Sequence, residues 1–375
     1  MEKKKILCLI PTIGDTKDIK RITLLLNNFL TLKVVGFDRN SFIARKPQFD
    51  VEIIASIEDR KYFSRLLKMI SVTFKLRRLI KENSVIYALN PDLAMWSYFA
   101  SIGLQRRLII DLADIREIQV SDSFFGVIYR FLDKYVTNRC ELLVVTSESF
   151  ISDYYNKRLN VFDKKYFVLE NKVDYKIEVN HNVKNINNLI VIGYFGVIRD
   201  KWTLYLLTTL VKKFPERFRV LIAGVCVLKG VDLFQLSKDD CNITYFGPYK
   251  SPEDLEYLYG QIDVLALFYP DYNSSKNWFN AKKICRSNRF YEGLYFNKPF
   301  ISFDFCEDGK IVKFNNIGMT LKNYDIEDSL LEIEKYLNIV NIEKWKNNIR
   351  EIPESMYLIN EQGEEFARVI SDLCN

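Results

Sequence analysis

The chain has 375 residues, of which 48% are hydrophobic and 27% are charged, and its formal net charge is +6. This length is long for one core and predicts two domains of an ordinary soluble protein. No apolar run approaches the roughly 20 residues that cross a bilayer, so a membrane-spanning helix is excluded. The modest charge excludes nothing by itself, and we expect no nucleic-acid partner.

The numbers and positions of cysteine and histidine limit the metal sites, disulfides and catalytic bases that the chain can have. The seven cysteines are scattered without a Cys-x-x-Cys pair, which argues against a zinc site or a disulfide framework and fits a reducing cytoplasm. The single histidine, His181, lies in an asparagine-rich stretch, so we interpret it as a linker residue. We therefore expect no metal site and no histidine-centred mechanism, and any base is a carboxylate or belongs to the substrate.

Short apolar runs alternate with amphipathic stretches from the first residues onward, which is typical of parallel strands joined by covering helices. The basic N-terminus is followed by an apolar stretch too short for a signal peptide, and we expect it to be the first strand. In the first half the predicted strands are 6–10, 33–37, 51–55, 85–89, 108–112, 142–146 and 167–169.

Residues 60–81 have an amphipathic pattern in which eight lysines and arginines are set among apolar side chains. We expect one helix here. A basic amphipathic helix can lie on anionic lipid, so this segment is a candidate for peripheral membrane contact. A covering helix with a solvated basic face is the competing interpretation, and the sequence leaves both open.

A polar stretch divides the chain. We assign 1–175 to an N-terminal domain, 176–188 to a linker, 189–353 to a second domain and 354–375 to a helix that packs back toward the N-terminal domain. The second domain has predicted strands at 189–195, 220–223, 243–246, 264–268 and 300–303. Two doubly wound α/β domains in tandem are therefore expected, with ligands at the carboxyl ends of the strands. Glycine spacings of dinucleotide folds and P-loops do not occur.

Two segments of the second domain predict an anion site. Gly196 follows the first strand and allows close backbone approach, while Arg199 and Lys201 bring positive charge to the start of a helix. Further on, Ser287 is a plausible N-cap of a helix that carries Arg289 and Glu292. A diphosphate could bind at that helix N-terminus and a ribose at the carboxylate one turn further in. A surface helix with an ordinary ion pair is the alternative.

These motifs follow one another in a recognisable order. The donor-binding half of GT-B glycosyltransferases, and above all of the large glycosyltransferase family four group of the bacterial surface-polysaccharide type, is similar to residues 192–201, 221–224, 242–247, 255–259, 262–264, 289–292 and 297–301. The resemblance covers the second domain, and 168–174 extend it more loosely into the first. It implies a GT-B architecture of two tandem Rossmann-like domains facing across a cleft.

The resemblance also implies an activity. It implies transfer of a sugar from a nucleotide diphosphate sugar to a glycan or lipid-linked glycan acceptor in cell-surface polysaccharide synthesis, of the capsule or lipopolysaccharide kind. The reaction is expected to be hexosyltransferase-like, retaining and metal-independent, with no cofactor besides the nucleotide sugar. We expect the enzyme in the cytoplasm, at the inner face of the membrane.

Residue roles follow from the matched motifs. In the second domain the resemblance gives Arg199 and Lys201 the catalytic task of neutralising the departing diphosphate, and it assigns donor binding to Gly196, Asn288, Arg289 and Glu292. In the first domain it makes Asp114 a catalytic candidate near the transferred sugar and puts Gly14 and Arg116 on the acceptor side. An aspartate that caps the next turn is an equal alternative for Asp114.

The sequence departs from the family in one place. Members commonly carry a second glutamate eight positions before the one that matches Glu292, and Ile284 stands there instead. The donor sugar therefore stays open, and the loop 271–283 with Trp278 is either a replacement or a surface excursion. Two other functions remain in view: a GT-B-type nucleotide-sugar epimerase, and a non-catalytic nucleotide-binding subunit of a glycosyltransferase complex.

Overall fold

A computed structural model of the chain describes residues 5–27, 32–39, 47, 49–58, 62–177, 189–269 and 283–374, with the backbone alone at 16, 17, 62 and 63. The chain divides into two compact units. Unit 1 comprises Met1–Glu170 and Asn360–Asn375, and unit 2 comprises Asn171–Ile359. Each unit contains one parallel sheet covered by helices, so the prediction of two α/β folds in tandem is confirmed.

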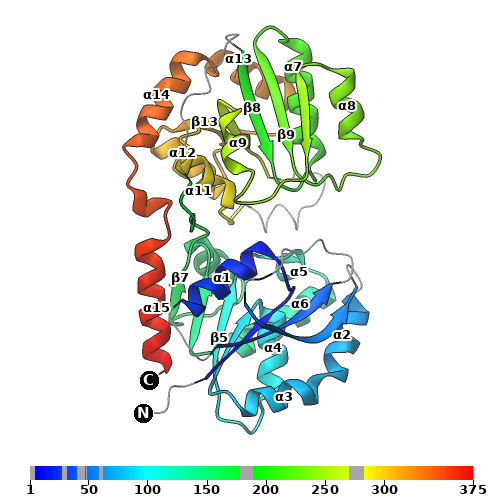
Figure 1. Cartoon of the computed structure of the whole chain (residues 1–375), viewed down its shortest axis with the longest axis vertical. Helices are drawn as coiled ribbons and strands as arrows, with labels where there is room; N and C mark the ends of the chain where they lie inside the picture. Colours follow the sequence, from blue (N-terminus) through cyan, green and yellow to red (C-terminus); the bar gives the residue numbers. More distant parts are fainter. Residues whose placement is uncertain are drawn as a thin grey trace. The chain divides into compact units, whose positions relative to one another are not determined.

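Unit 1 is built on a seven-stranded parallel sheet (Figure 1). The order of its strands is β3-β2-β1-β4-β5-β6-β7. The interior strand β1 is buried at all five positions, which explains why its sequence is a continuous apolar run. The strands are β1 (Ile6–Ile10), β2 (Leu32–Arg39), β3 (Val51–Ile57), β4 (Val85–Leu89), β5 (Arg107–Leu112), β6 (Leu142–Val145) and β7 (Tyr166–Val168).

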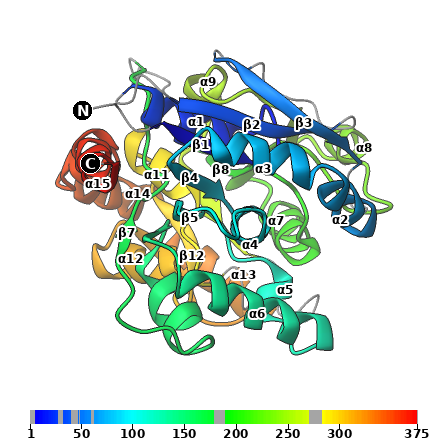
Figure 2. The same ribbon diagram turned by 90° about the horizontal axis from the view of Figure 1, so that it is seen from below.

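Helices cover both faces of this sheet. The helices are α1 (Thr16–Leu26), α2 (Tyr62–Ser71), α3 (Thr73–Lys81), α4 (Pro91–Ala100), α5 (Glu117–Val120), α6 (Phe124–Thr137), the π-helix η1 (Phe150–Asn156) and α15 (Asn360–Cys374). Figure 2 shows α3, α4 and α6 on one face and α15 on the other. The last helix begins at Asn360 and not at 354, because Pro353 and the short 3-10 helix η2 (Glu354–Met356) precede it.

The segment 60–81 differs from its prediction. It forms two helices, α2 and α3, with a break at Val72, and residues 60 and 61 lie outside the described residues. The hydroxyls of Ser71 and Thr73 donate to carbonyls three and four residues back, at 2.8 and 2.9 Å. Such bonds compete with the helical ladder and bend helices, which accounts for the break.

Unit 2 has a six-stranded parallel sheet in the order β10-β9-β8-β11-β12-β13. The edge strand β13 was not predicted, because it is only four residues long and mixes glycine and threonine with apolar residues. The strands are β8 (Ile190–Phe195), β9 (Phe218–Ala223), β10 (Ile243–Gly247), β11 (Val264–Leu267), β12 (Phe300–Phe303) and β13 (Gly318–Leu321). The helices are α7 (Lys201–Lys213), α8 (Leu233–Asp239), α9 (Leu255–Gly260), α11 (Asn288–Tyr295), α12 (Glu307–Phe314), α13 (Ile326–Tyr336) and α14 (Ile339–Arg350).

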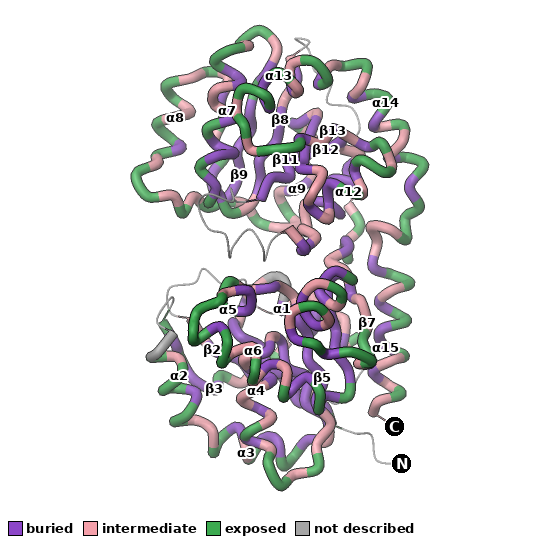
Figure 3. Tube along the Cα trace, turned by 180° about the vertical axis from the view of Figure 1, so that it is seen from behind, coloured by how far each residue is buried: buried purple, intermediate pink, exposed green. Residues whose placement is uncertain are grey.

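The sheet of unit 2 separates two apolar clusters, one on each face. In β9, Val220 and Ile222 belong to one cluster, while Leu221 and Ala223 belong to the other. The first cluster includes residues of α7 and α13, and the second includes residues of α9 and α11. Figure 3 shows the buried strands between more exposed helices. This two-sided burial holds the carboxyl ends of the strands in fixed positions.

Within the part of the chain that the structure describes, no helix has both the length and the apolar character needed to span a membrane. Two predicted features cannot be followed. His181 and most of the predicted linker fall in 178–188, and Trp278 falls in 270–282, and both ranges lie outside the described residues.

Candidate functional site

Two glycine turns meet at the carboxyl end of β8. Gly196 has φ of 105° and Gly224, after β9, has φ of 134°, both in the region that favours glycine. A Cβ atom on Gly224 would lie 1.6 Å from the Gly196 carbonyl oxygen, so the turn after β9 can approach the Gly196 backbone only because residue 224 lacks a side chain. Arg289 lies against this contact, with its Cδ atom 3.9 Å from the Cβ position of Gly196.

Arg289 is held in place by the end of β8. Its Nη1 atom donates to the Phe195 carbonyl oxygen at 2.8 Å, so the guanidinium of this α11 residue reaches the end of the strand. Ser287 is the N-cap of α11, as predicted, and its Oγ accepts from the Phe290 N–H at 3.3 Å. The first backbone N–H groups of a helix have no partner within it, so an anion here would meet these groups and Arg289 together.

Glu292 lies one turn further along α11 and is 9% exposed. Its Oε2 atom accepts from the Tyr259 hydroxyl at 2.9 Å. Burial, and after it the negative charge of Glu292, raises the pKa of Tyr259, Tyr249 and Tyr175. The carboxylate therefore stands among three tyrosines from three separate segments, none of which the sequence identified as a site residue.

The interpretation of α11 as a surface helix is wrong. Most of its residues are buried, including Phe290, Tyr291 and Leu294, which pack in the apolar cluster with α9. Burial and then the negative charge of Glu292 raise the pKa of Tyr249, and the positive charge of Arg289 lowers it. Both charged groups therefore lie near this one phenol. Arg289 and Glu292 are thus held by a helix that is packed into unit 2.

Asp308 of α12 supports the start of α11. Its buried Oδ2 atom accepts from the Ser287 N–H at 3.3 Å, from the Ser287 hydroxyl at 3.1 Å and from the Tyr269 hydroxyl. Burial raises the pKa of Asp308 to about 6, although these hydrogen bonds and the charge of Arg286 act in the opposite direction. This carboxylate was missed by sequence reasoning because it lies twenty-one residues beyond the cap that it holds.

Arg199 and Lys201 flank the N-cap of α7. The cap is Asp200, whose buried carboxylate accepts from the second and third backbone N–H groups of the helix, both at 3.1 Å. Both basic side chains are exposed. Burial raises the pKa of Tyr194, and the charges of Arg289 and Arg199 both oppose that rise, so the two arginines lie around the same end of β8. Asn288 is half-buried at the first position of α11.

Ile284 is buried in the interior of unit 2, where it is 7% exposed. An apolar side chain therefore occupies the position at which the resemblance leads one to expect a second glutamate. Lys283, the last residue of the loop 271–283, is described, and its carbonyl accepts from the Glu307 N–H at 3.1 Å. The segment before α11 is thereby tied to the start of α12.

The candidates of unit 1 lie after two strands that flank β4. Gly14 follows β1 with φ of 89°, and Asp114 lies half-buried in the loop after β5. Arg116, which follows, is engaged inside the unit. Its two terminal nitrogens donate to the two oxygens of Asp92, each at 2.6 Å, and one of them also donates to the Tyr129 hydroxyl at 3.0 Å.

The resemblance put Arg116 on the acceptor side, but its guanidinium is engaged by Asp92 within unit 1. A bidentate pair of half-buried side chains fixes the guanidinium, and although desolvation would raise the pKa of Asp92, the ion pair with Arg116 lowers it. Sequence reasoning missed this partner, because it lies twenty-four residues earlier, at the start of α4. Among the described residues, no group of three or more histidine, cysteine, aspartate or glutamate side chains could hold a metal ion.

No known protein family profile matches the chain. It is similar to the succinoglycan biosynthesis protein ExoL of Rhizobium meliloti strain 1021, with 22% identity over 345 residues that cover 86% of this chain and 82% of ExoL. The structure of Anabaena Alr3699/HepE in complex with UDP and glucose matches with a TM-score of 0.70 at 15% identity, over 98% of this chain and 99% of that one. Sucrose-phosphate synthase from Thermosynechococcus elongatus matches with a TM-score of 0.70 at 12% identity, over 99% of each chain. These likenesses span nearly the whole chain and confirm the predicted GT-B fold.

Proposed function

We propose that this chain is a glycosyltransferase that moves a sugar from a nucleotide diphosphate sugar to a glycan or lipid-linked glycan acceptor in cell-surface polysaccharide synthesis. The observation that carries the proposal is the arrangement of Arg289 and Glu292 on α11, at the glycine turns after β8. Two similarities support it: the fold relative HepE was solved with UDP and glucose, and ExoL is named for succinoglycan biosynthesis.

The proposed donor site follows the axis of α11. The diphosphate would lie at the helix N-terminus, where backbone N–H groups and Arg289 are attracted to an anion. Four helical residues rise about 6 Å, so Glu292 would reach the ribose hydroxyls while Asn288 lies beside the phosphates. A carboxylate can accept from both hydroxyls of a ribose.

The proposed catalysis is stabilisation of the leaving group. Negative charge grows on the departing diphosphate in the transition state, and cations already in place stabilise that charge without rearranging. Arg289 is fixed by a backbone carbonyl, and Arg199 lies around the same strand end. Lys201 would add a more mobile charge. Reaction with retention, independence of metal, and action at the cytoplasmic face of the membrane belong to this proposal.

A panel of nucleoside diphosphate sugars tests the proposal. A donor held at about a hundred times its dissociation constant should stabilise the chain by about 2.7 kcal/mol, which thermal unfolding would detect. Incubation of the bound donor with and without glycan acceptors should then yield a glycosylated acceptor. Accumulation of an epimer without acceptor would show an epimerase instead. Binding without turnover would favour the non-catalytic subunit, which the buried Ile284 keeps in view.

A further inference from the structure

Tyr259 is a buried residue that joins the helix of the proposed donor site to its neighbours. It lies near the end of α9, it is 0% exposed, and its hydroxyl donates to the Oε2 atom of Glu292 at 2.9 Å. Burial, and after it the charge of Glu292, raises the pKa of Tyr259. The phenol therefore keeps its proton near neutral pH and remains the donor of this hydrogen bond.

The ring of Tyr259 is held by two aromatic neighbours. It stacks on Phe296, with ring centroids 4.7 Å apart and an interplanar angle of 15°. It also forms an edge contact with Phe195, with centroids 5.3 Å apart and an interplanar angle of 77°. All three side chains are buried. Because a packed interior leaves such rings little room to move, the hydroxyl of Tyr259 has a fixed position.

The two aromatic neighbours connect Tyr259 to both charged residues of the proposed donor site. Phe195 is the last residue of β8, and its carbonyl oxygen accepts from Arg289 at 2.8 Å. Phe296 is the C-cap of α11, and its N–H donates to the Glu292 carbonyl oxygen at 2.9 Å. Tyr259 thus packs against the strand end that fixes the arginine and against the end of the helix that carries the carboxylate.

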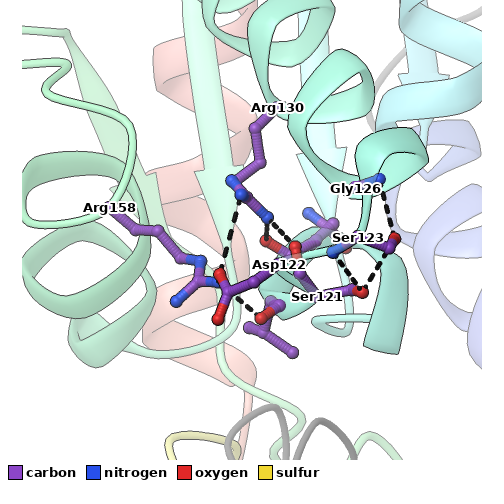
Figure 4. Close-up of polar contacts among 8 residues, drawn as sticks. Ser121, Asp122, Ser123, Gly126, Arg130 and Arg158 are labelled. Atoms are coloured by element: carbon purple, nitrogen blue, oxygen red, sulfur yellow. Dashed lines mark hydrogen bonds and ion pairs between the residues drawn. The ribbon is translucent and has the colours of Figure 1, made fainter.

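A polar cluster in unit 1 shows a different arrangement (Figure 4). There Arg158 and Arg130 donate to backbone carbonyl oxygens of the loop before α6, and they lie 2.5 and 3.8 Å from the carboxylate of Asp122. Asp122 is 89% exposed, so water screens its charge. Glu292 instead accepts from a phenol that belongs to an apolar cluster. A carboxylate buried in this way contributes little to stability, which favours a task in ligand binding.

The hydrogen bond from Tyr259 limits the directions in which the carboxylate of Glu292 can turn. A carboxylate has about four acceptor positions, and the phenol occupies one of them. Ribose hydroxyls would use others of these positions. If a bound nucleotide lacked its 2′-hydroxyl, an acceptor position would be taken out of water without a donor. Sites built to bind a hydroxyl discriminate strongly against ligands that lack it.

We propose that Tyr259 is a positioning residue that orients Glu292 toward the ribose and thereby makes the donor site selective for ribonucleotides over 2′-deoxyribonucleotides. The inference rests on the proposed function, because it takes a nucleotide sugar as the ligand. It extends that function to a substrate class, the ribonucleoside diphosphate sugars. Tyr259 acts only through the carboxylate of Glu292 and does not itself contact the substrate.

Calorimetric binding of UDP and 2′-deoxy-UDP, and of the corresponding guanosine and adenosine pairs, tests the proposal. The wild type should bind the ribonucleotide of the accepted base at least about tenfold more tightly than its 2′-deoxy form. Tyr259→Phe keeps the ring and removes the hydroxyl, so this ratio should fall to about threefold or less. Glu292→Gln should lower the ratio at least as far, and adding Tyr259→Phe to it should lower the ratio no further, because the phenol acts through the carboxylate.

Two further variants separate positioning from general effects on the fold. Tyr257→Phe is the matched control, since Tyr257 belongs to the same helix and is 58% exposed, and it should leave the ratio unchanged. Phe296→Leu keeps the Tyr259 hydroxyl but removes the ring on which it stacks, so it should lower the ratio about threefold. Thermal unfolding identifies the folded variants, and Phe296→Leu provides the test if Tyr259→Phe does not fold.

The outcomes distinguish this inference from the proposed function. An equal loss of affinity for both nucleotides in Tyr259→Phe, with the ratio unchanged, would make Tyr259 a merely structural residue and overturn the proposal. Equal binding of the ribo and 2′-deoxy forms by the wild type would also overturn it, while nucleotide binding itself would stand. Absence of binding of every nucleoside diphosphate would contradict the proposed function and this inference with it.

Discussion

Arg289 and Glu292 owe their positions to different neighbours, and this allows their contributions to donor binding to be separated. Arg289→Ala removes a fixed cation, whereas Glu292→Gln keeps an acceptor for the Tyr259 hydroxyl and removes the negative charge. Hydrogen bonds to charged groups contribute about 1.5 to 3 kcal/mol, so each change should raise the dissociation constant of the donor about 10- to 150-fold.

Titration calorimetry with the nucleotide sugar that stabilises the wild type measures these constants. Arg219→Ala, which removes an exposed arginine of β9, is the matched control and should bind as the wild type does. Wild-type affinity in both site variants would mean that the donor binds elsewhere on the chain.

Asp308 should make the stability of the chain depend on pH. Its pKa is raised from 3.8 to about 6, so the folded chain holds this proton more tightly than the unfolded chain does. The stabilisation is present below about pH 4 and is lost as the pH rises through 6. In Asp308→Asn the proton-linked part disappears. The free energy of unfolding of the wild type, relative to Asp308→Asn, should therefore fall by up to roughly 3 kcal/mol between about pH 4 and pH 7.

Urea unfolding at a series of pH values checks the Asp308 prediction. Glu343→Gln, a change of an exposed carboxylate on α14, provides the comparison and should leave the pH profile unaltered. If the difference in free energy of unfolding between wild type and Asp308→Asn stayed constant across this pH range, protonation of Asp308 would not be linked to stability.

At the residue scale, the sequence pattern located charged residues better than it located the side chains that contact them. Ser287, Arg289 and Glu292 lie within six consecutive residues, so local spacing was sufficient to predict the cap and the helix that carries the two charged residues. Tyr175, Tyr249 and Tyr259 reach Glu292 from separate segments, and Asp92 reaches Arg116 from another strand connection. Such partners depend on the packing of distant segments, which periodicity does not encode.

At the scale of elements, the turn after β9 needs a glycine at 224 because the backbone of Gly196 lies against it. Gly224→Ala would place a Cβ atom 1.6 Å from the Gly196 carbonyl in a backbone region that disfavours side chains. Displacing that backbone should cost about 3 kcal/mol or more, or prevent folding. Gly230→Ala is the matched change, because Gly230 also has positive φ but no atom lies within 4 Å of its Cβ position.

Thermal unfolding of the two glycine variants measures the difference. Gly230→Ala should cost only about 1 to 2 kcal/mol, from the left-handed backbone. Equal destabilisation by both changes would show that backbone conformation, and not the contact with Gly196, sets the requirement at 224.

Elements that are buried on both faces were the easiest to predict. Strands such as β1 and β4 are apolar at every position because helices cover both faces of the sheet. β13 was missed because an edge strand of four residues carries little pattern. The helix predicted over 60–81 was wrong in its continuity, because the hydroxyls of Ser71 and Thr73 interrupt a pattern that apolar spacing alone would continue.

At the scale of the whole molecule, the order of the motifs carried more information than any one of them. A base and an acid three residues apart, such as Arg289 and Glu292, occur on many helices. Their place after a glycine turn and before the Pro299 strand indicated a GT-B fold, and the likeness to HepE over 98% of this chain agrees. The donor sugar could not be predicted, since the shape of a binding site depends on loops whose conformation the sequence pattern does not specify.

The most direct test of the account is sugar transfer by the purified chain, followed as glycosylated acceptor formed from the nucleotide sugar that stabilises it. The wild type and Arg219→Ala should transfer the sugar at the same rate. Arg289→Ala and Glu292→Ala should each lose most or all of the transfer while unfolding cooperatively near the wild-type temperature. Full transfer by both of these variants would contradict the account.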